Sequence, residues 1–417
     1  MGLGTVGRAF LRALAENRDD IGRRLAEPLE VTRILVRDPA RHPEERHRLT
    51  TDARDILDDP EISVVVEVMG GREPARTYML EALRRGKSVV TANKEVLAYA
   101  GPELWAAAEA GQADLRFEAS VGGGIPVVQG LTQGLAADRV RSVVGIVNGT
   151  TNYILTRMTD EGSSFEQALA AAQAAGYAEA DPTDDLDGHD AARKIAILAS
   201  IAFGAHVSPD DVAVEGIRHV TAEDIRYGQG QGWRLKVVAS ARLEADGLLL
   251  RVGPAFLPQD HPLAGVSGAY NAILVEGEPV GQVMFFGPGA GGGPTASAVL
   301  GDVIEIAWGR HQGVSAPRPV RYRPCPLKDP ATDELAAYWR LDVVDRPGTL
   351  AQVAQALSEA SVSLRSVEQR PKPDGRATLL LVTHRCREGA LRQAVANTGR
   401  LPVVLSMGPP IRVEGVD

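Results

Sequence analysis

The sequence predicts an α/β protein with a doubly wound parallel sheet, a second domain of α+β type and a small C-terminal βαββαβ domain. Three observations support this prediction. Short apolar strands alternate with helices over residues 1–116, longer β-branched strands follow between 233 and 290, and residues 338–417 show a strand–helix–strand pattern twice. A chain of 417 residues also has the length of two or three ordinary domains.

The first domain is predicted from four short strands separated by helices. The strands are expected at 31–36, 63–68, 87–91 and 115–118, with helices over Pro74–Arg85 and Gly101–Ala110. This alternation implies right-handed crossovers, so the strands should run parallel with helices on both faces of the sheet. Gly86 follows the first of these helices, where a left-handed residue commonly ends a helix.

A glycine turn opens the chain in the stretch MGLGTVGRAF. Gly2, Gly4 and Gly7 fit the G-x-G-x-x-G turn of a Rossmann-type sheet, which binds a dinucleotide pyrophosphate between a strand and a helix. The helix is plausible, but the first strand is missing because only Met1 precedes the turn. A translation start assigned too late explains this more economically than evolved loss. We therefore expect a gap or an improvised substitute in the sheet, which a complete parallel sheet would contradict.

Two further loops follow strands of this domain. The stretches VVVEVMGG and VVTANKEVLA place glycines and a lysine at the carboxyl ends of strands, where open α/β sheets bind ligands. Lys94 is either part of that site or a solvated lysine at a helix start. Arg37 follows the strand at 31–36 and precedes Asp38. An arginine at this position can bind a 2′-phosphate and so favours NADP over NAD. The alternative is that Arg37 is only a solvated residue at the end of the strand.

The predicted pattern of secondary structure changes after residue 118. A glycine-rich turn, EASVGGGIP, leads into helices at 165–175 and 188–203 and then into the strands of 233–290. The stretch GPGAGGGPTASAV begins either a flexible loop or a helix that returns the chain to the first domain. We predict four parts: a dinucleotide-binding domain at 1–116 completed by 289–325, an α+β domain at 117–288, a linker at 326–337, and a ferredoxin-like domain at 338–417.

The densest group of ionisable residues is GYAEADPTDDLDGHDAARKIAIL. Lys194 lies four residues after Asp190, so both side chains share one face of a helix. One interpretation is an acid-rich loop that caps the helix, with these two residues as a surface ion pair. The other is a buried site, because the apolar run IAILASIAF follows directly. A buried lysine has a tunable proton, and clustered carboxylates suit the ammonium group of an amino-acid substrate.

The residue types present limit which metal ions could bind and how the two cysteines are interpreted. No His/Asp/Glu spacing in the acidic cluster matches a zinc or EF-hand pattern. Glu118 stands before a glycine-rich turn whose carbonyls could converge, which suits a hard monovalent cation. Cys325 and Cys386 are far apart and are interpreted as incidental thiols of a reducing compartment.

Composition excludes several classes of protein. The formal charge of -9 and a pI near 5.5 argue against a nucleic-acid partner. Neither a secretory signal nor an apolar run long enough to cross a bilayer is visible, so no membrane partner and a cytoplasmic location are expected.

Several motifs in one order resemble homoserine dehydrogenase of the long form with a C-terminal ACT domain. They are GLGTVG, TANK, EASVGGGIP, NGTTNYIL, GYAEADPTDDLDGHDAARK, GPGAGGGPTASAV and DRPGTLAQVA, and they span almost the whole chain. The resemblance implies reversible NAD(P)H-dependent reduction of L-aspartate 4-semialdehyde to L-homoserine in threonine, methionine and isoleucine biosynthesis. The alternatives are a catalytically inactive amino-acid sensor, suggested by the missing strand, and a dehydrogenase of another semialdehyde.

The resemblance also implies roles for individual residues. Lys194 matches the catalytic lysine, while Glu179 and Asp190 match the homoserine-binding carboxylates with Asp185 in support. A sodium site is implied at Glu118, Val121, Gly123 and Ile125, the last three through their carbonyls. The residues implied for the cofactor site, together with Arg37, are Gly2, Gly4, Thr5, Val6, Gly7, Gly70, Thr91, Ala92, Lys94, Gly176 and Gly289.

An ACT domain implies regulation and assembly. Such domains bind amino acids and pair their sheet edges, so the resemblance implies a homodimer or homotetramer with L-threonine as effector. The predicted effector position is the turn after the first strand of this domain, at Asp345, Pro347 and Gly348.

Overall fold

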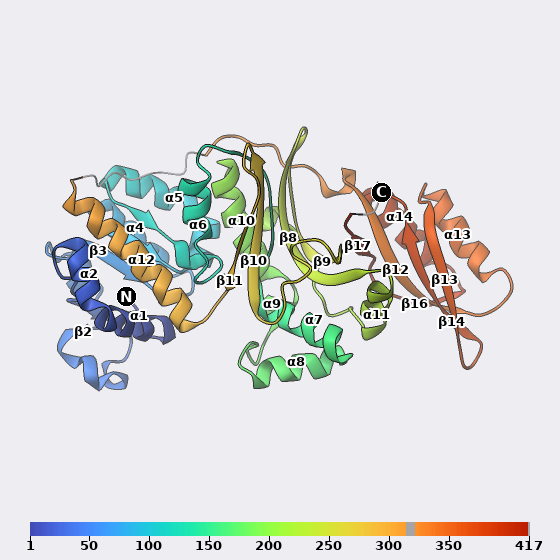
Figure 1. Ribbon diagram of the computed structural model, residues 1–417, viewed down its shortest axis with the longest axis horizontal. Helices are drawn as coiled ribbons and strands as arrows, with labels where there is room; N and C mark the ends of the chain where they lie inside the picture. The colour runs from blue at the N-terminus through green and yellow to red at the C-terminus, as the bar shows by residue number, and fades with distance from the viewer. Residues whose placement is uncertain (314–321, 416–417) are drawn as a thin grey trace. The chain divides into compact units, whose positions relative to one another are not determined.

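The computed structural model describes residues 1–313 and 322–415, and its chain divides into two compact units. Unit 1 comprises Met1–Val143, Ala192–Asp211 and Tyr270–Cys325; unit 2 comprises Val144–Ala191, Val212–Ala269 and Pro326–Asp417. The boundary falls inside strand β6 (Arg139–Ile146) and inside helix α10 (His189–Phe203). Figure 1 labels the elements of both units.

The N-terminal part of unit 1 has the predicted alternation of strands and helices. Strands β3, β4 and β5 form one parallel sheet, and β1 and β2 form a second, separate parallel pair. The elements are α1 (Thr5–Glu16), α2 (Arg18–Leu25), β1 (Ile34–Leu35), β2 (Leu49–Thr50), α3 (Arg54–Leu57), β3 (Val64–Glu67), α4 (Ala75–Arg84), β4 (Ser88–Thr91), α5 (Lys94–Gly111) and β5 (Leu115–Arg116). The Rossmann-like fold is confirmed, but its parallel sheet is interrupted.

A cavity of about 200 Å³ lies in the interruption and is lined by residues of β1, β3 and α1. Met1 and Gly2 bridge one end of it: the Met1 nitrogen donates to Val66 O at 2.7 Å, Val68 N donates to Met1 O at 3.0 Å, and Gly2 N donates to Leu35 O at 3.0 Å. These two residues therefore substitute for the last rungs of a parallel ladder. Burial lowers the pKa of the Met1 amine to about 6. The sheet thus shows the predicted gap and a partial substitute.

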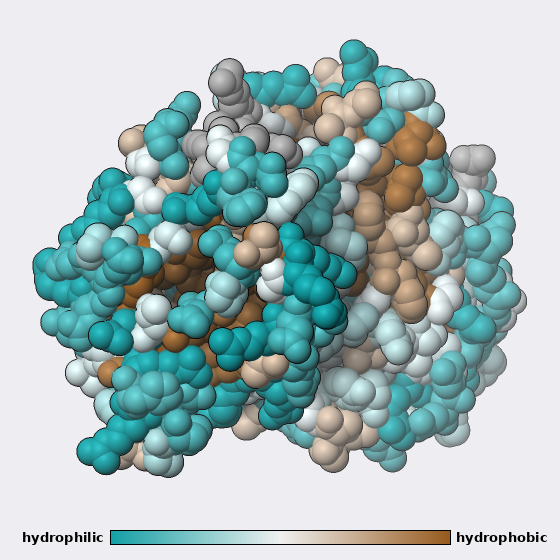
Figure 2. Space-filling model, turned by 60° about the vertical axis from the view of Figure 1, so that its left-hand side comes forward, coloured by the Kyte–Doolittle hydropathy of each residue, from teal (hydrophilic) through white to brown (hydrophobic). Residues whose placement is uncertain are grey.

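The remainder of unit 1 includes a helix, α12, and a 3₁₀ turn that contact β4 of this sheet. Its elements are the 3₁₀ turn Glu118–Ser120, α6 (Val127–Gln129), the antiparallel hairpin β10 (Tyr270–Glu278) and β11 (Gly281–Pro288), and α12 (Gly292–His311). Helix α12 packs along α1, as Figure 1 shows, and Phe10 and Val299 belong to their shared apolar core. In Figure 2 apolar side chains are visible in recesses between polar ones on the face that is turned forward.

The first half of unit 2 consists of helices and a long hairpin. Strands β8 and β9 pair antiparallel along their whole length, and β7 adds to β9 in parallel. The elements are α7 (Gly149–Glu161), α8 (Phe165–Ala174), α9 (Thr183–Leu186), β7 (Ala213–Val214), α11 (Ala222–Gly230), β8 (Trp233–Glu244) and β9 (Gly247–Pro258). Strand β9 is buried along almost its whole length, which explains its nearly continuous apolar sequence.

The C-terminal part of unit 2 has the predicted βαββαβ order with two short strands added. Its core is built around Trp339, Leu341 and Leu379. The elements are β12 (Glu334–Val344), α13 (Thr349–Glu359), β13 (Leu364–Lys372), β14 (Arg376–Thr383), β15 (Cys386–Arg387), α14 (Glu388–Thr398), β16 (Val404–Met407) and β17 (Ile411–Val413). Strand β17 pairs with β12 and, in parallel, with β9, so one sheet continues from the hairpin into this part.

Three predicted boundaries differ from the structure. Strand β1 has only two residues instead of 31–36. Helix α5 begins at Lys94, where the Asn93 side chain accepts a hydrogen bond from Val96 N at 3.1 Å; the helix is kinked at Ala100, and the predicted helix from 101 is its second segment. Strand β12 begins at Glu334, inside the predicted linker, because Leu335 pairs with Cys386 of β15. The predicted completion of the first domain by 289–325 includes residues outside the described ranges. Among the described residues no helix is long and apolar enough to cross a membrane.

Candidate active site

Two glycines of the turn in unit 1 lie so close to neighbouring backbone atoms that they leave no room for a side chain. Gly2 has φ +94°, and a Cβ there would lie 2.8 Å from Val68 O. A Cβ on Gly7 would lie 2.6 Å from Gly2 O, so both positions exclude any side chain. Gly4 is exposed, and no atom of the described residues lies within 4 Å of such a Cβ, which leaves room for an approaching ligand. Helix α1 begins at Thr5, so its first amides are directed to this open side.

A buried carboxylate ties together the two other predicted cofactor loops. Glu67 ends β3 with no solvent exposure; it accepts hydrogen bonds from Met69 N at 2.8 Å and Thr91 Oγ1 at 2.6 Å. Asn93 donates to Gly71 O at 2.7 Å and so joins the same loops. Sequence reasoning missed Glu67 and Asn93. A carboxylate inside an apolar strand was the available signal, because a buried charge must be hydrogen-bonded.

The remaining cofactor candidates of unit 1 lie around these loops with different exposure. Gly70 is exposed and left-handed, with φ +75°. Ala92 and Lys94 are half-buried at the start of α5, and Val6 is half-buried in the first turn of α1. Arg37 is exposed directly after β1, and its neighbour Asp38 caps the 3₁₀ turn that follows by accepting from Ala40 N at 3.0 Å.

In unit 2 an asparagine links two of the predicted substrate carboxylates. Asn148 Nδ2 donates to Asp185 Oδ1 at 2.7 Å and to Asp190 Oδ2 at 2.9 Å. Asn148 Oδ1 accepts from Thr151 N at 2.9 Å, which caps α7 and fixes the amide orientation. Asp190 is only 3% exposed. Sequence reasoning quoted the NGTTNYIL motif but gave Asn148 no role, since the partner carboxylates lie 37 and 42 residues along the chain.

The other acidic candidates lie apart from this network. Glu179 is exposed, and its backbone carbonyl accepts from Gln173 Nε2 at 3.1 Å. No hydrogen bond within the described residues of unit 2 joins the Glu179 carboxylate to Asp185 or Asp190. Gly176 is exposed with φ +76°, directly before the exposed Tyr177.

Lys194 is 8% exposed and lies on α10, four residues after Asp190 on the same helix. The burial of both residues contradicts the interpretation of a surface ion pair. Asp187, by contrast, is a surface partner: it accepts from Arg218 Nε at 2.7 Å. The cluster therefore divides into a buried portion at Asp190 and Lys194 and a solvated portion at Asp187.

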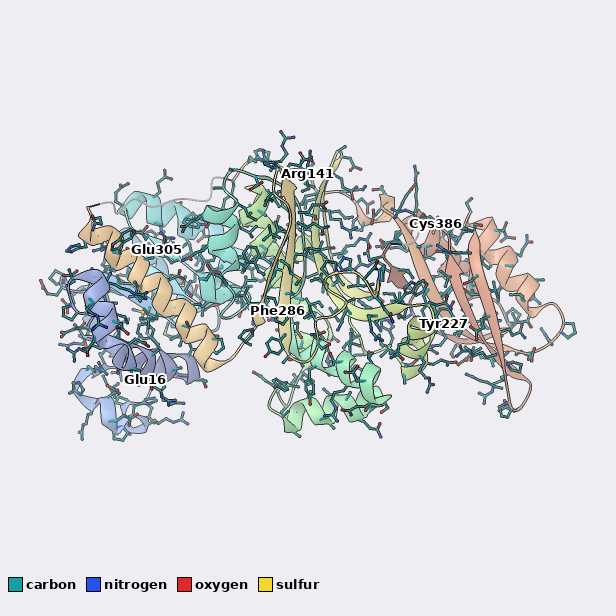
Figure 3. All side chains as sticks on the ribbon, in the orientation of Figure 1. Glu16, Arg141, Tyr227, Phe286, Glu305 and Cys386 are labelled. Carbon is teal, nitrogen blue, oxygen red and sulfur yellow. The ribbon has the colours of Figure 1, made fainter. Side chains whose placement is uncertain are left out.

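In the turn of unit 1 that was predicted to bind a cation, the carboxylate of Glu118 accepts hydrogen bonds from nearby backbone amides. Glu118 is 5% exposed and accepts from Val128 N at 2.7 Å and Gln129 N at 2.8 Å; burial raises its pKa although these bonds oppose the shift. Beside it Glu305 of α12, labelled in Figure 3, accepts from Gln129 Nε2 at 2.9 Å. Among the described residues no group of three or more His, Cys, Asp or Glu side chains could hold a metal.

The backbone of the same turn is tightly packed. Val121 and Ile125 are buried, and Gly123 is left-handed with φ +59°. A Cβ on Gly123 would lie 2.7 Å from the carbonyl carbon of Gly289, and one on Gly289 would lie 2.0 Å from Asn271 Nδ2. Asn271 is 1% exposed, and neither of its amide atoms has a hydrogen-bond partner among the described residues.

Comparisons with known proteins agree with this geometry. Residues 2–118 match the NAD binding domain of homoserine dehydrogenase, residues 126–304 match homoserine dehydrogenase, and residues 340–401 match the ACT domain. The homoserine dehydrogenase of Corynebacterium glutamicum is 44% identical over 99% of this chain and 94% of its own length; that of Bacillus subtilis is 39% identical over 100% and 97%.

Solved structures give the same result. A homoserine dehydrogenase from Thiobacillus denitrificans superimposes with a TM-score of 0.93 at 39% identity, covering 99% of this chain and 96% of the other. A hyperthermophilic archaeal homoserine dehydrogenase mutant in complex with NADPH gives 0.63 at 30% identity, covering 73% and 95%. Both the cofactor half and the catalytic half are therefore matched, and the chain belongs to the homoserine dehydrogenase family of nicotinamide-dependent oxidoreductases, with an ACT domain at its C-terminus.

Proposed function

We propose that this chain catalyses the reversible reduction of L-aspartate 4-semialdehyde to L-homoserine with Lys194 as the proton donor. The observation that carries the proposal is a lysine with 8% exposure, one helical turn after a carboxylate with 3% exposure. A nicotinamide cofactor supplies the hydride when bound. Family membership and the two matched catalytic domains argue against an inactive amino-acid sensor.

Lys194 would act on the aldehyde oxygen. Hydride addition turns a neutral carbonyl oxygen into an alkoxide, and an ammonium group in a water-poor site stabilises the developing charge and donates a proton. In the reverse direction the neutral amine accepts the proton of the homoserine hydroxyl. The surrounding apolar helix limits competing water.

Asp190 and Asp185 would hold the amino-acid end of the substrate. Both carboxylates accept a hydrogen bond from one amide, that of Asn148, which fixes their orientation for a substrate ammonium. Glu179 remains a proposed third carboxylate, and its exposure leaves its side chain able to move toward a bound substrate.

The proposed cofactor site consists of the glycine turn, the loops joined by Glu67, and Gly176 and Gly289 at closing loops. Arg37, exposed after β1, supports NADP as the preferred dinucleotide because its guanidinium can pair with a 2′-phosphate. Fluorescence titration with NADPH and NADH would test this, and Arg37→Ala should weaken NADPH binding more than NADH binding.

A sodium ion is proposed at the turn of Val121, Gly123 and Ile125 beside Glu118. The chemistry of the turn fits a hard monovalent cation, since it offers carbonyls and a nearby unpartnered amide, Asn271, instead of several carboxylates. The ion would fix the turn that contacts Gly289. Thermal melts in equal concentrations of sodium and tetramethylammonium chloride test this: sodium should raise the melting temperature of the chain without cofactor.

Regulation, assembly and location complete the proposal. L-Threonine is the proposed effector, bound at the turn of Asp345, Pro347 and Gly348. The proposed assembly is a homodimer or homotetramer. The proposed location is the cytoplasm. The exposed pair of Tyr270 and Phe286, stacked with ring centroids 5.2 Å apart on the β10–β11 hairpin, supports a self-association surface; Phe286 is labelled in Figure 3. Light scattering with Phe286→Lys should give a smaller species.

The decisive experiment is NAD(P)-dependent oxidation of L-homoserine by the purified chain and by Lys194→Ala. The substitution should lower kcat by about 10²–10⁴-fold, the contribution typical of a general acid–base group, with little change in NADPH affinity. Lys194→Arg serves as a control that keeps the charge but cannot release its proton. Near-normal turnover in Lys194→Ala would remove this lysine from the catalytic role.

A further inference from the structure

Unit 2 contains a buried lysine that the proposed mechanism does not use. Lys236 lies on strand β8 and is only 4% exposed. Its Nζ donates to Val266 O at 2.6 Å and to Asn152 Oδ1 at 3.2 Å. Asn152 is part of helix α7, and Val266 belongs to the segment that joins β9 to β10. One ammonium group therefore joins three parts of the unit.

Burial makes a charge at this position unfavourable. It lowers the pKa of the Lys236 ammonium to about 8, against the attraction of Asp160. The two hydrogen-bond acceptors are an amide oxygen and a carbonyl oxygen, both of them neutral. Replacing buried charged groups by apolar side chains of similar volume is often neutral for stability. Stability alone therefore does not explain a lysine here, and the segments that it joins indicate a role in positioning.

The segment 266–269 lies along the first two turns of α7. The Nδ2 of Asn152 donates to the first carbonyl of this segment at 3.2 Å, and Gly268 N donates to Thr156 Oγ1 at 3.1 Å. A Cβ on Gly149 would lie 2.8 Å from the carbonyl oxygen of the last residue of the segment. The ammonium of β8 thus binds the helix and the segment at the place where they contact each other.

Helix α7 begins directly after Asn148, whose side chain contacts the two proposed substrate carboxylates. Asn148 Nδ2 donates to Asp185 Oδ1 at 2.7 Å and to Asp190 Oδ2 at 2.9 Å. One helical turn later, Asn152 N donates to Asn148 O at 3.3 Å. A shift of α7 would therefore move Asn148 away from the carboxylates that it orients.

We propose that Lys236 is a positioning residue: its ammonium holds α7 against β8, so that Asn148 keeps both proposed substrate carboxylates in place. The role of these carboxylates rests on the proposed function. Misplacing the groups that orient a substrate by about 1 Å can cost about 10²-fold in rate. Because Lys236 acts through groups that hold the amino-acid end of the substrate, its loss should raise KM more than it lowers kcat.

Steady-state oxidation of L-homoserine at saturating NADP separates positioning from a structural role. Lys236→Met keeps a side chain of similar length but removes the charge and the donor. We expect KM for homoserine to rise about tenfold while kcat stays within about threefold, with a melting temperature close to that of the parent. A loss of folded enzyme would instead lower kcat and leave KM unchanged.

A second buried lysine provides the matched control. Lys87 is 6% exposed and donates to Ile62 O at 2.7 Å, but it lies in unit 1. Lys87→Met should leave KM for homoserine within about twofold, whatever its effect on the melting temperature. If Lys236→Met does not fold, Lys236→Gln replaces it, since its amide is neutral and one atom shorter; the same rise in KM is expected.

Hydrogen exchange of the full chain, followed by mass spectrometry, tests the positioning step without an assay of activity. Amides exchange faster where local opening becomes easier. In Lys236→Met, the peptides that cover 148–156 and 185–190 should exchange about threefold faster or more. Helix α12 of unit 1 should exchange as it does in the parent chain.

The outcomes decide between explanations. Unchanged KM in Lys236→Met overturns the proposal, whether kcat falls or not, and so does a raised KM without faster exchange at 148–156. Faster exchange at 148–156 but not at 185–190 would show that α7 is held without any effect on the carboxylates, which also overturns it. Faster exchange of both segments in a chain that does not oxidise homoserine would uphold the positioning role and refute the proposed function.

Discussion

The glycine turn of unit 1 and the Asn148 network of unit 2 are built in opposite ways. In the turn, close approach of backbone to backbone excludes side chains, as the 2.6 Å separation between a Gly7 Cβ and Gly2 O shows. In the network, one amide makes hydrogen bonds of 2.7 and 2.9 Å to two carboxylates that are distant in sequence. In the proposed function the first arrangement would bind a ligand through backbone amides, and the second through charged side chains. The two regions should therefore respond to different substitutions.

The largest effect is expected where a charge is removed from the network. Asp190→Asn keeps the shape but removes the negative charge facing the substrate, and hydrogen bonds to charged groups contribute about 1.5–3 kcal/mol. We expect kcat/KM for homoserine to fall about 10–100-fold, mostly through KM, in steady-state assays. Asp187→Asn, at the solvated Arg218 contact, is the matched control and should stay within about twofold.

Substitutions in the glycine turn should separate a loss of stability from a loss of NADPH binding. Gly7→Ala places a methyl group against Gly2 O, so both the melting temperature and NADPH affinity should fall, the latter about tenfold or more. Gly4→Ala meets no atom within 4 Å in the part of the chain that the structure describes, and should weaken NADPH binding at an unchanged melting temperature. Equal melting temperatures for both variants would show that the turn is not sterically determined.

A smaller effect is expected at Glu67, which resembles the network in chemistry but belongs to the cofactor side. Glu67→Gln retains an acceptor for Met69 N, yet one oxygen is replaced by a donor that cannot accept from Thr91 Oγ1. We expect a loss of about 1–2 kcal/mol in the free energy of unfolding, measured by urea denaturation. Thr91→Val should cost a similar amount, and the double variant should be less than additive.

The smallest effect concerns Glu215, whose side chain is 39% exposed, so that solvent weakens the effect of its charge. Because the pKa of Glu215 is raised to about 7 from 4.5, the folded chain binds its proton more tightly than the unfolded chain. Stability should therefore decrease as pH rises from about 5 to 7 through this group. Arg251, Arg412, Glu388 and His219 face the same carboxyl. In the absence of ligand, Glu215→Gln should melt about 1–2 °C above the parent at pH 8 and equal to it at pH 5. An identical difference at both values would contradict the shift.

The fold and half of the site could be predicted from local patterns. The βαββαβ order of the C-terminal domain, the helix that carries Asp190 and Lys194, and the glycine turn all follow from periodicity and from residues with restricted conformations. The predicted gap in the parallel sheet is present as a cavity of about 200 Å³. Strand lengths were less predictable: β1 has only two residues, which pair with β2.

By itself the sequence determined which residue types are available and where helices and glycine turns form, because these depend on neighbours within a few positions. Only the tertiary structure decided which charges meet. Asn148 reaches Asp185 and Asp190 across 37 and 42 residues, and Glu215 shares a cavity with Arg412. It also decided that Asp190 and Lys194 are buried while Asp187 is solvated. The apolar run after Lys194 indicated burial, but it could not show which acidic residues share it. Long-range pairing arises from the packing of distant elements, and spacing along the chain carries no information about it.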